Sequence, residues 1–211
     1  MKTSARLSAI SAAIGLGLLA ASGTSWAESQ YGYDPTGAGV RTATARLNIT
    51  VAVPKLILLR VGTSGTAVDT IALGANFTNG IPGGLATLAD GSNQATGWDG
   101  TAPTLTTTSS GTVQAWAWTN SGGGGSVSSA VTTPFPAGSG ITASDITVTS
   151  TPVGTTGLNH PGANTGTSTP TTFPRNVVAT SNWTFAATPA VLAGVAGGAT
   201  TQVVTYTATT L

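Results

Sequence analysis

The sequence predicts a single all-β domain folded as an antiparallel β-sandwich, and three observations support that prediction. Short runs in which apolar and polar residues alternate recur along the chain, which is typical of half-buried strands. Gly and Pro punctuate these runs at the places where turns are needed. Beyond the first 27 residues, amphipathic helical periodicity is missing, and no repeat of fixed period suggests a solenoid.

The first 27 residues have the three parts of a secretory signal peptide. Lys2 and Arg6 are basic, residues 7–21 are apolar, and a polar stretch ends in Ser25-Trp26-Ala27. The apolar stretch is shorter than the roughly 20 residues that span a bilayer. We therefore expect cleavage after Ala27, export by a bacterium through the periplasm, and a secreted or cell-surface protein without a membrane span.

The composition of the exported chain excludes several classes of function. Cleavage leaves five basic and six acidic side chains, so there is no basic patch for nucleic acid. The whole chain has no Cys and one His. Catalysis usually needs a group that titrates near pH 7, an activated nucleophile or a bound metal. We therefore expect neither an enzyme nor a cofactor-binding protein, and we assign no catalytic residue.

The N-terminal part of the exported chain divides into an arm and a first strand. Residues 28–44 are polar and contain Gly, which predicts a flexible arm before a domain of residues 45–211. Apolar side chains then alternate with polar ones at Leu47, Ile49, Val51 and Val53. This alternation predicts a strand with one buried face, and Pro54 interrupts it because Pro lacks the N–H needed in a sheet.

Further strands follow in order along the chain. The patterns predict strands over residues 55–61, 67–73, 111–120, 146–149, 176–180, 182–187 and 202–209. Residues 74–102 are irregular, with room for two short strands, and residues 122–125 and 151–174 are predicted loops. Only residues 188–196 are expected to form a turn or two of helix, weakened by Gly194.

Three tryptophans are candidate ligand-binding residues. Trp116 and Trp118 share one face of the strand predicted over residues 111–120. They would either form a platform for sugar rings or pack as large side chains in the core, and the apolar character of both strand faces favours core packing. Trp98 stands alone in a loop rich in Gly and Asp, which makes it the better candidate for an exposed binding residue.

The few remaining polar candidates do not combine into a chemical site. His160 lies in a predicted loop without a second His or a Cys to complete a metal site, so we interpret it as a solvated histidine. The loop from Asp90 to Asp99 carries enough oxygen atoms to suggest Ca²⁺. Its spacing matches no calcium-binding motif, and Asp-Gly turns explain the same residues, so no metal site is assigned.

The arrangement of the terminal strands resembles that of bacterial surface and pilus subunits with immunoglobulin-like folds, the chaperone–usher pilins. The resemblance covers the signal peptide, the polar arm, the alternating segment 47–53 and the Thr-rich final strand 203–208. In that family the N-terminal segment of one subunit completes the sheet of the next by strand addition. The resemblance implies another surface subunit and a periplasmic chaperone as candidate partners.

These observations favour an exported structural or adhesive protein that assembles through its terminal strands. Contacts in strand addition would come from the apolar side chains of the first strand and, in the last strand, from Val204 and Tyr206. Residues 43–53 are alternatively the first strand of the chain's own domain. The alternative function is a monomeric secreted module that binds carbohydrate or another small ligand through its tryptophans.

Overall fold

The computed structural model describes residues 28–107 and 110–211, and it divides the chain into two units that meet between Val53 and Pro54. The predicted signal peptide and its cleavage site lie outside the described residues. In the described part of the first unit the backbone forms no strand, and a turn at residues 35–36 reverses the chain. Two ion pairs cross this segment, Arg41 with Asp34 and Arg46 with Glu28.

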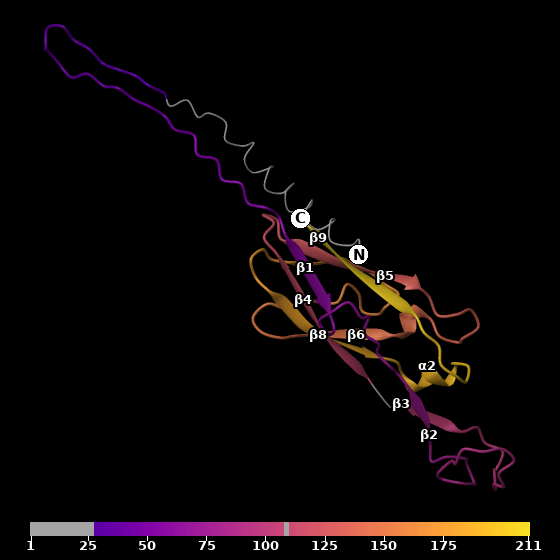
Figure 1. The fold of residues 1–211 in the computed structure, drawn as a ribbon. Coiled ribbons are helices and arrows are strands. Elements are labelled where there is room, and N and C mark those ends of the chain that lie inside the picture. The colour runs from indigo at the N-terminus through magenta and orange to yellow at the C-terminus, as the bar shows by residue number, and fades with distance from the viewer. Residues whose placement is uncertain (1–27, 108–109) are drawn as a thin grey trace, which may run out of the picture. The chain divides into compact units, whose positions relative to one another are not determined.

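The second unit holds all the regular structure of the described chain (Figure 1). Its strands are β1 (Ile57–Val61), β2 (Ala75–Thr78), β3 (Thr104–Thr107), β4 (Gly111–Thr119), β5 (Gly125–Thr133), β6 (Thr147–Pro152), β7 (Thr171–Phe173), β8 (Ala179–Ala186) and β9 (Val203–Thr210). A 3-10 turn at Ala143–Asp145 and the short helix α2 (Pro189–Ala193) are the helical elements among these residues. The prediction of an all-β chain with a helical turn near residue 190 is therefore confirmed.

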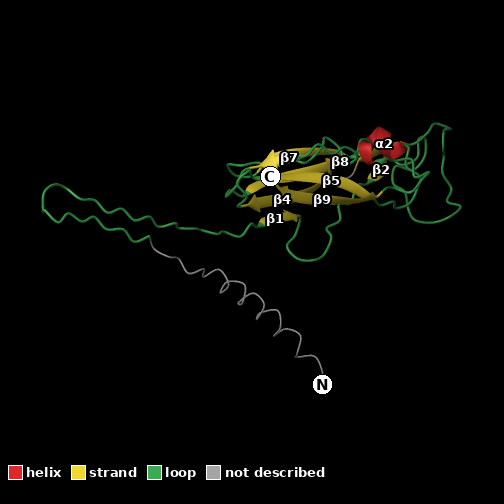
Figure 2. Ribbon diagram, turned by 90° about the horizontal axis from the view of Figure 1, so that it is seen from above, coloured by secondary structure: helices red, strands yellow, loops and turns green. Residues whose placement is uncertain are grey.

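The strands form antiparallel sheets of four, three and two members. The four-stranded sheet has the order β1-β4-β8-β6, the three-stranded sheet has the order β7-β5-β9, and β2 pairs with β3. Strands β1 and β9 are each at the end of a sheet, and they lie next to each other. Figure 2 shows α2 at the end of the strands where β2 lies.

One hydrophobic cluster lies between the buried faces of the two larger sheets. The four-stranded sheet contributes Ala115, Ala117, Val148, Ala179, Trp183 and Phe185, and the three-stranded sheet contributes Val127 and Phe173. Trp183 is fully buried, and its indole N–H donates to the carbonyl of Leu158 at 2.7 Å. Because a buried indole N–H needs a partner, this bond ties the loop after β6 to the core.

The connection between β4 and β5 depends on two glycines. Gly124 adopts φ +80°, where a side chain would be strained and would also meet the carbonyl oxygen of Phe173. At Gly125 a side chain would collide with the Phe173 ring, which lies directly over the backbone. These contacts explain why glycine occupies positions 124 and 125, in the stretch that the sequence analysis interpreted only as a flexible loop.

The strand expected over residues 43–53 is absent, and the prediction of a buried Leu/Ile/Val face there is wrong. Leu47 and Ile49 are 70% and 79% exposed, and the segment pairs with no strand among the described residues. The alternation of apolar residues is present, but alternation shows only that one face can be buried. Whether it is buried depends on the presence of a neighbouring strand.

Other strand predictions need correction too. Residues 67–73 form no strand, although Ile71 and Leu73 still pack against the core. Strand β5 was missed because Ser and Thr dominate it, and its buried positions are filled mainly by small residues. Strand β7 lies within the long loop predicted over residues 151–174. The two strands predicted around residue 181 form the single strand β8.

Candidate functional site

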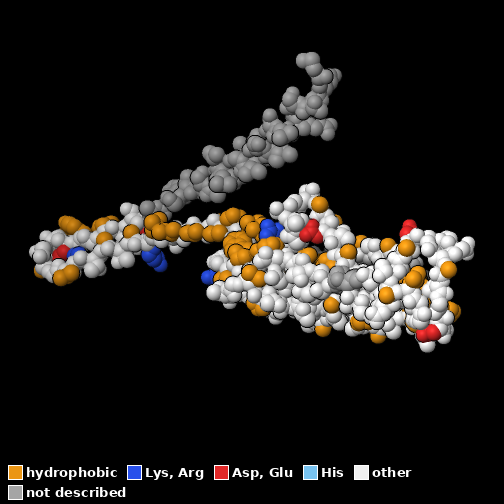
Figure 3. Space-filling model, turned by 90° about the horizontal axis from the view of Figure 1, so that it is seen from below, with side chains coloured by type: hydrophobic (Ala, Val, Ile, Leu, Met, Phe, Trp, Pro, Cys, Tyr) orange, Lys and Arg blue, Asp and Glu red, His pale blue; other side chains and the backbone are white. Residues whose placement is uncertain are grey.

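The extended segment before β1 is the most unusual surface of the described chain. Its apolar side chains are all exposed, by 70% at Leu47, 79% at Ile49, 79% at Val51 and 69% at Val53. Figure 3 shows hydrophobic side chains following one another along this part of the chain. A row of exposed apolar residues on one side of an extended backbone is costly in water unless a partner covers it.

Asn120 holds the chain where this segment joins the second unit. Its side-chain amide donates to the carbonyl of Pro54 at 2.7 Å and accepts from the N–H of Leu56 at 2.8 Å. The Thr119 hydroxyl also donates to the Leu56 carbonyl at 2.8 Å. The Asn120 amide therefore pairs with residues 54–56 as a neighbouring strand would, and it keeps them extended up to the first residue of β1.

The edge strands β1 and β9 present only half-covered inner faces. Along β9 the side chains alternate between exposed and half-buried, with Val204 and Tyr206 on the half-buried side. The inward side chains of β1, among them Ile57 and Leu59, also pack against the core while staying partly exposed. The hydrophobic core is therefore incompletely covered along these two of the end strands of the larger sheets.

The edge of β9 carries few of the features that prevent strand pairing. Within the described residues β9 pairs with β5 alone. None of its eight residues is charged or Pro. Charged residues and Pro are common devices against edge-to-edge association, and β9 lacks both. Strand β1 lies beside β9 without pairing with it, so the backbone groups on this side of β9 form no ladder with a described strand. The sequence analysis had singled out both Val204 and Tyr206, and the structure places them on the face that such a strand would border.

Trp116 and Trp118 lie on the outer face of the four-stranded sheet, so the interpretation that they pack in the core is wrong. Ala115, Ala117 and Thr119 are buried on the opposite face of β4, whereas both tryptophans stay half-buried. The division of the strand into these two faces was predicted correctly. The error came from assigning the larger side chains to the core, which is filled here by Trp183 from the adjacent strand.

Arg60 covers the ring of Trp116. The two residues face each other in the register of β1 and β4, and the guanidinium carbon lies 3.3 Å from the centroid of the indole ring. This is the geometry of a cation–π contact. Sequence reasoning missed Arg60, for which the only signal was a charged side chain within the apolar run of residues 56–61.

Trp98 is exposed, as the sequence suggested, and the structure places it in the irregular region between β2 and β3. It is 60% exposed, and its indole N–H donates to the carbonyl of Thr101 at 2.7 Å. The Asp99 carboxylate accepts hydrogen bonds from the hydroxyl and the backbone N–H of Thr101, which hold the pKa of Asp99 below its usual range. In the described part of the chain no three His, Asp or Glu residues come together as metal ligands would.

His160 is buried rather than solvated, which corrects the sequence interpretation. It is 7% exposed, and its ring meets those of Trp183, Phe185 and Tyr206 edge-on. Its Nδ1 lies 2.7 Å from the Gly162 carbonyl and its Nε2 lies 2.9 Å from the Tyr206 hydroxyl. The Gly162 N–H also approaches Nδ1, at 3.2 Å, but the carbonyl contact is the shorter one. Because a carbonyl can only accept, this geometry fits the neutral ring with the proton on Nδ1. The loop sequence around His160, Leu158-Asn159-His160-Pro161-Gly162, gives no sign of this packing.

Burial sets the protonation states of His160 and Tyr206. It lowers the pKa of His160, opposed in part by the hydrogen bond to Gly162, and it raises the pKa of the Tyr206 hydroxyl above its usual range. Both groups are therefore uncharged at neutral pH. The hydrogen bond between His160 and Tyr206 joins the loop after β6 to β9, an end strand of the three-stranded sheet.

We expect acidification to destabilise the protein through His160. Unfolded histidine takes up a proton below about pH 6.5, whereas the folded ring resists it, so stability falls as pH drops from about 6.5 toward the lowered folded-state pKa, by at most about 1.4 kcal/mol per unit. Melting temperatures at pH 7.5 and 5.5 measure the effect. The chain has a single His, so His160→Gln should remove the loss in this window. An equal loss in the variant would contradict the assignment.

Comparisons of the chain with family models, curated proteins and solved structures found no match. In the described ranges no helix has the length and apolar character needed to cross a membrane.

Proposed function

We propose that the chain is an exported structural or adhesive surface protein whose copies assemble by strand addition. The observation that carries the proposal is the row of exposed apolar side chains between Leu47 and Val53, which no strand of the described chain covers. The proposal includes a signal peptide over residues 1–27, release at a bacterial cell surface, and a role without catalysis. The two larger sheets together would form an immunoglobulin-like sandwich.

In this assembly the segment around Ile49 of one copy adds to the free edge of β9 in the next. Its backbone would supply the hydrogen bonds that β9 lacks on that side. Its apolar side chains would cover the half-buried inner faces of β1 and β9. Fully burying a Leu, Ile or Val side chain contributes roughly 1.5–3 kcal/mol, so four such residues can offset the cost of ordering the segment.

The electrostatics support association as well. The exported chain has five basic and six acidic residues, so copies repel one another weakly. Until a segment is added, the open edge would remain a site for unwanted pairing. A periplasmic chaperone that covers this edge is therefore a fitting partner before assembly, and another surface subunit is a fitting partner during it.

Deletion of residues 28–53 tests the proposal. The full exported chain should form oligomers on size-exclusion chromatography, and the shortened chain should be monomeric. A peptide of residues 43–53 should bind the shortened chain and add protected amides along β9 in hydrogen exchange. A peptide of the same composition in scrambled order is the matched control.

Two results would contradict assembly by strand addition. One is a full chain that stays monomeric at high concentration, and the other is a shortened chain that still forms oligomers. Either would favour the second candidate function, a monomeric module that binds carbohydrate. That function is supported by the exposure of Trp98 and by the outward position of Trp116 and Trp118.

A further inference from the structure

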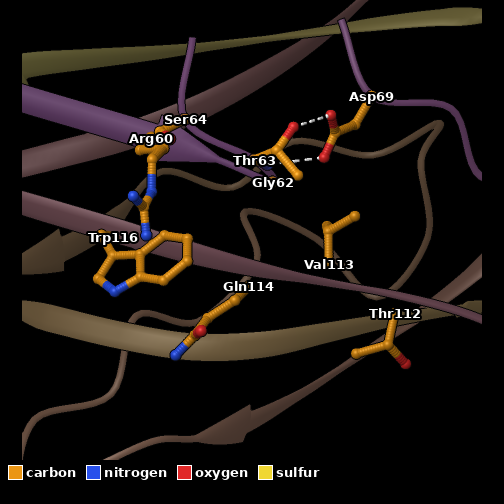
Figure 4. Close-up of a pocket in the computed structure, with 9 residues that line it drawn as sticks. All are labelled: Arg60, Gly62, Thr63, Ser64, Asp69, Thr112, Val113, Gln114 and Trp116. Atoms are coloured by element: carbon orange, nitrogen blue, oxygen red, sulfur yellow. Dashed lines mark hydrogen bonds between the residues drawn. The ribbon is translucent and has the colours of Figure 1, made fainter.

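The outer face of the four-stranded sheet contains a cavity at the end of β1. Its volume is about 370 Å³, and its polar lining comes from Arg60, Thr63, Ser64, Asp69, Thr112 and Gln114, with Trp116 as its floor beside Arg60. The loop after β1 is fixed to β4 because the Gly62 N–H donates to the Gln114 carbonyl at 2.8 Å. Figure 4 shows the Arg60–Trp116 stack on one side of the cavity and the Thr63–Asp69 pair on the other.

Arg60 is an exposed cation whose N–H groups face solvent rather than protein partners. Its guanidinium carbon lies 3.3 Å from the centroid of the Trp116 ring, a contact that limits its motion without using its N–H groups. Within the described residues Arg60 forms no salt bridge and no side-chain hydrogen bond. A planar guanidinium held in this way is preorganised for the two oxygens of a carboxylate.

Asp69 forms no salt bridge with Arg60, and both of its carboxylate oxygens accept hydrogen bonds from Thr63. The backbone N–H of Thr63 donates to Oδ2 at 2.7 Å and its hydroxyl donates to Oδ1 at 2.5 Å. These bonds hold the pKa of Asp69 below its usual range, so it is charged at neutral pH. Its remaining lone pairs can accept hydroxyl protons, and Gln114, whose NH₂ faces Thr180, keeps its amide oxygen free as another acceptor.

We propose that this cavity binds a uronic acid residue of an acidic polysaccharide. The sugar carboxylate pairs with the guanidinium of Arg60, and its ring hydroxyls donate to Asp69 and Gln114. A neutral sugar would offer no charged partner to Arg60, and it could not stack on the Trp116 face that the guanidinium already covers. A phosphate dianion carries two negative charges, and the site offers it one cation, Arg60, beside the Asp69 carboxylate. A monoanion with several hydroxyl groups fits this combination of one cation and several acceptors better.

The test uses the full exported chain and an oligogalacturonate as the probe, with its methyl ester as the uncharged counterpart. Binding is followed by calorimetry and by the fluorescence of the tryptophans. We expect the acid to bind at least ten times more tightly than the ester. Arg60→Gln should weaken binding of the acid at least tenfold, and Arg60→Lys should weaken it too, because lysine keeps the charge but loses the planar pair of donors.

Arg175→Gln is the matched control, since Arg175 is exposed, lies outside the cavity and carries the same charge. It should leave binding unchanged, and all variants should keep the melting temperature of the parent chain. The proposal is overturned if the parent chain does not bind the acid, if acid and ester bind equally, or if Arg60→Gln binds like the parent. Ligand binding at this cavity is independent of strand addition, so Arg60→Gln should still form oligomers. Failure of the ligand proposal can therefore be told apart from failure of the assembly proposal.

Discussion

Ile49→Asp should abolish oligomers of the exported chain and leave the stability of the single subunit unchanged. Ile49 is 79% exposed, so an aspartate there meets water in the isolated subunit. After strand addition the same aspartate would face the half-buried apolar side chains of β1 and β9 as an unpaired charge. That burial costs at least about 3 kcal/mol, which weakens association more than a hundredfold.

Thr50→Asp provides the matched control for this prediction. It adds the same charge one residue away, on the opposite side of the extended backbone, where an added strand would face solvent. We expect Thr50→Asp to assemble nearly as well as the parent chain. Size-exclusion chromatography and melting temperatures measure both variants. Loss of monomer stability in Ile49→Asp would show that residues 47–53 belong to the chain's own fold.

Trp183→Ala should be the most destabilising single change in the core. The side chain is fully buried between the sheets and the loop after β6, and it packs against His160 and Tyr206. Truncation leaves a cavity and removes the donor that satisfies the Leu158 carbonyl at 2.7 Å. Large-to-small changes of this kind cost about 3–5 kcal/mol. For a chain of this size the melting temperature should fall by roughly 6–20 °C.

Trp118→Ala provides the comparison, because Trp118 lies on the outer face of β4 and is half-buried. It should lower the melting temperature by clearly less than Trp183→Ala, as measured by circular dichroism. Trp183→Phe should fall between the two, since it keeps an aromatic ring but loses the indole N–H. Equal losses for Trp183→Ala and Trp118→Ala would mean that the two faces of the sheet are equally packed, contrary to the structure.

The strands that were predicted well combine strong alternation with large apolar residues. Strand β4 and strand β9 match their expected ranges within a residue or two because β-branched and aromatic residues repeat every second position there. Strand β5 has the same length as β4 but buries Gly125, Val127 and Ser129. Small and polar residues give little contrast between its two faces, so the central strand of a sheet was missed.

The site could be found from the sequence only in part. The alternation of Leu47 with Ile49 pointed to a segment able to pair, and the exposed position of Trp98 was expected. The Arg60–Trp116 stack was not predicted from the sequence. It depends on the register between two strands whose paired residues are more than fifty positions apart in the chain. His160 was placed in solvent for a related reason, since the rings that surround it come from β8 and β9.

The sequence by itself determined the β class of this protein, because side-chain alternation and turn residues are local properties of the chain. It also determined the apolar face of residues 47–53 and the division of residues 111–120 into two faces, with Trp116 and Trp118 on the same one. Only the tertiary structure decided which apolar faces are covered: that of β4 meets Val127 and Phe173, whereas that of Ile49 meets no strand in the described chain. Burial requires a second surface, and the position of that surface depends on contacts between distant residues.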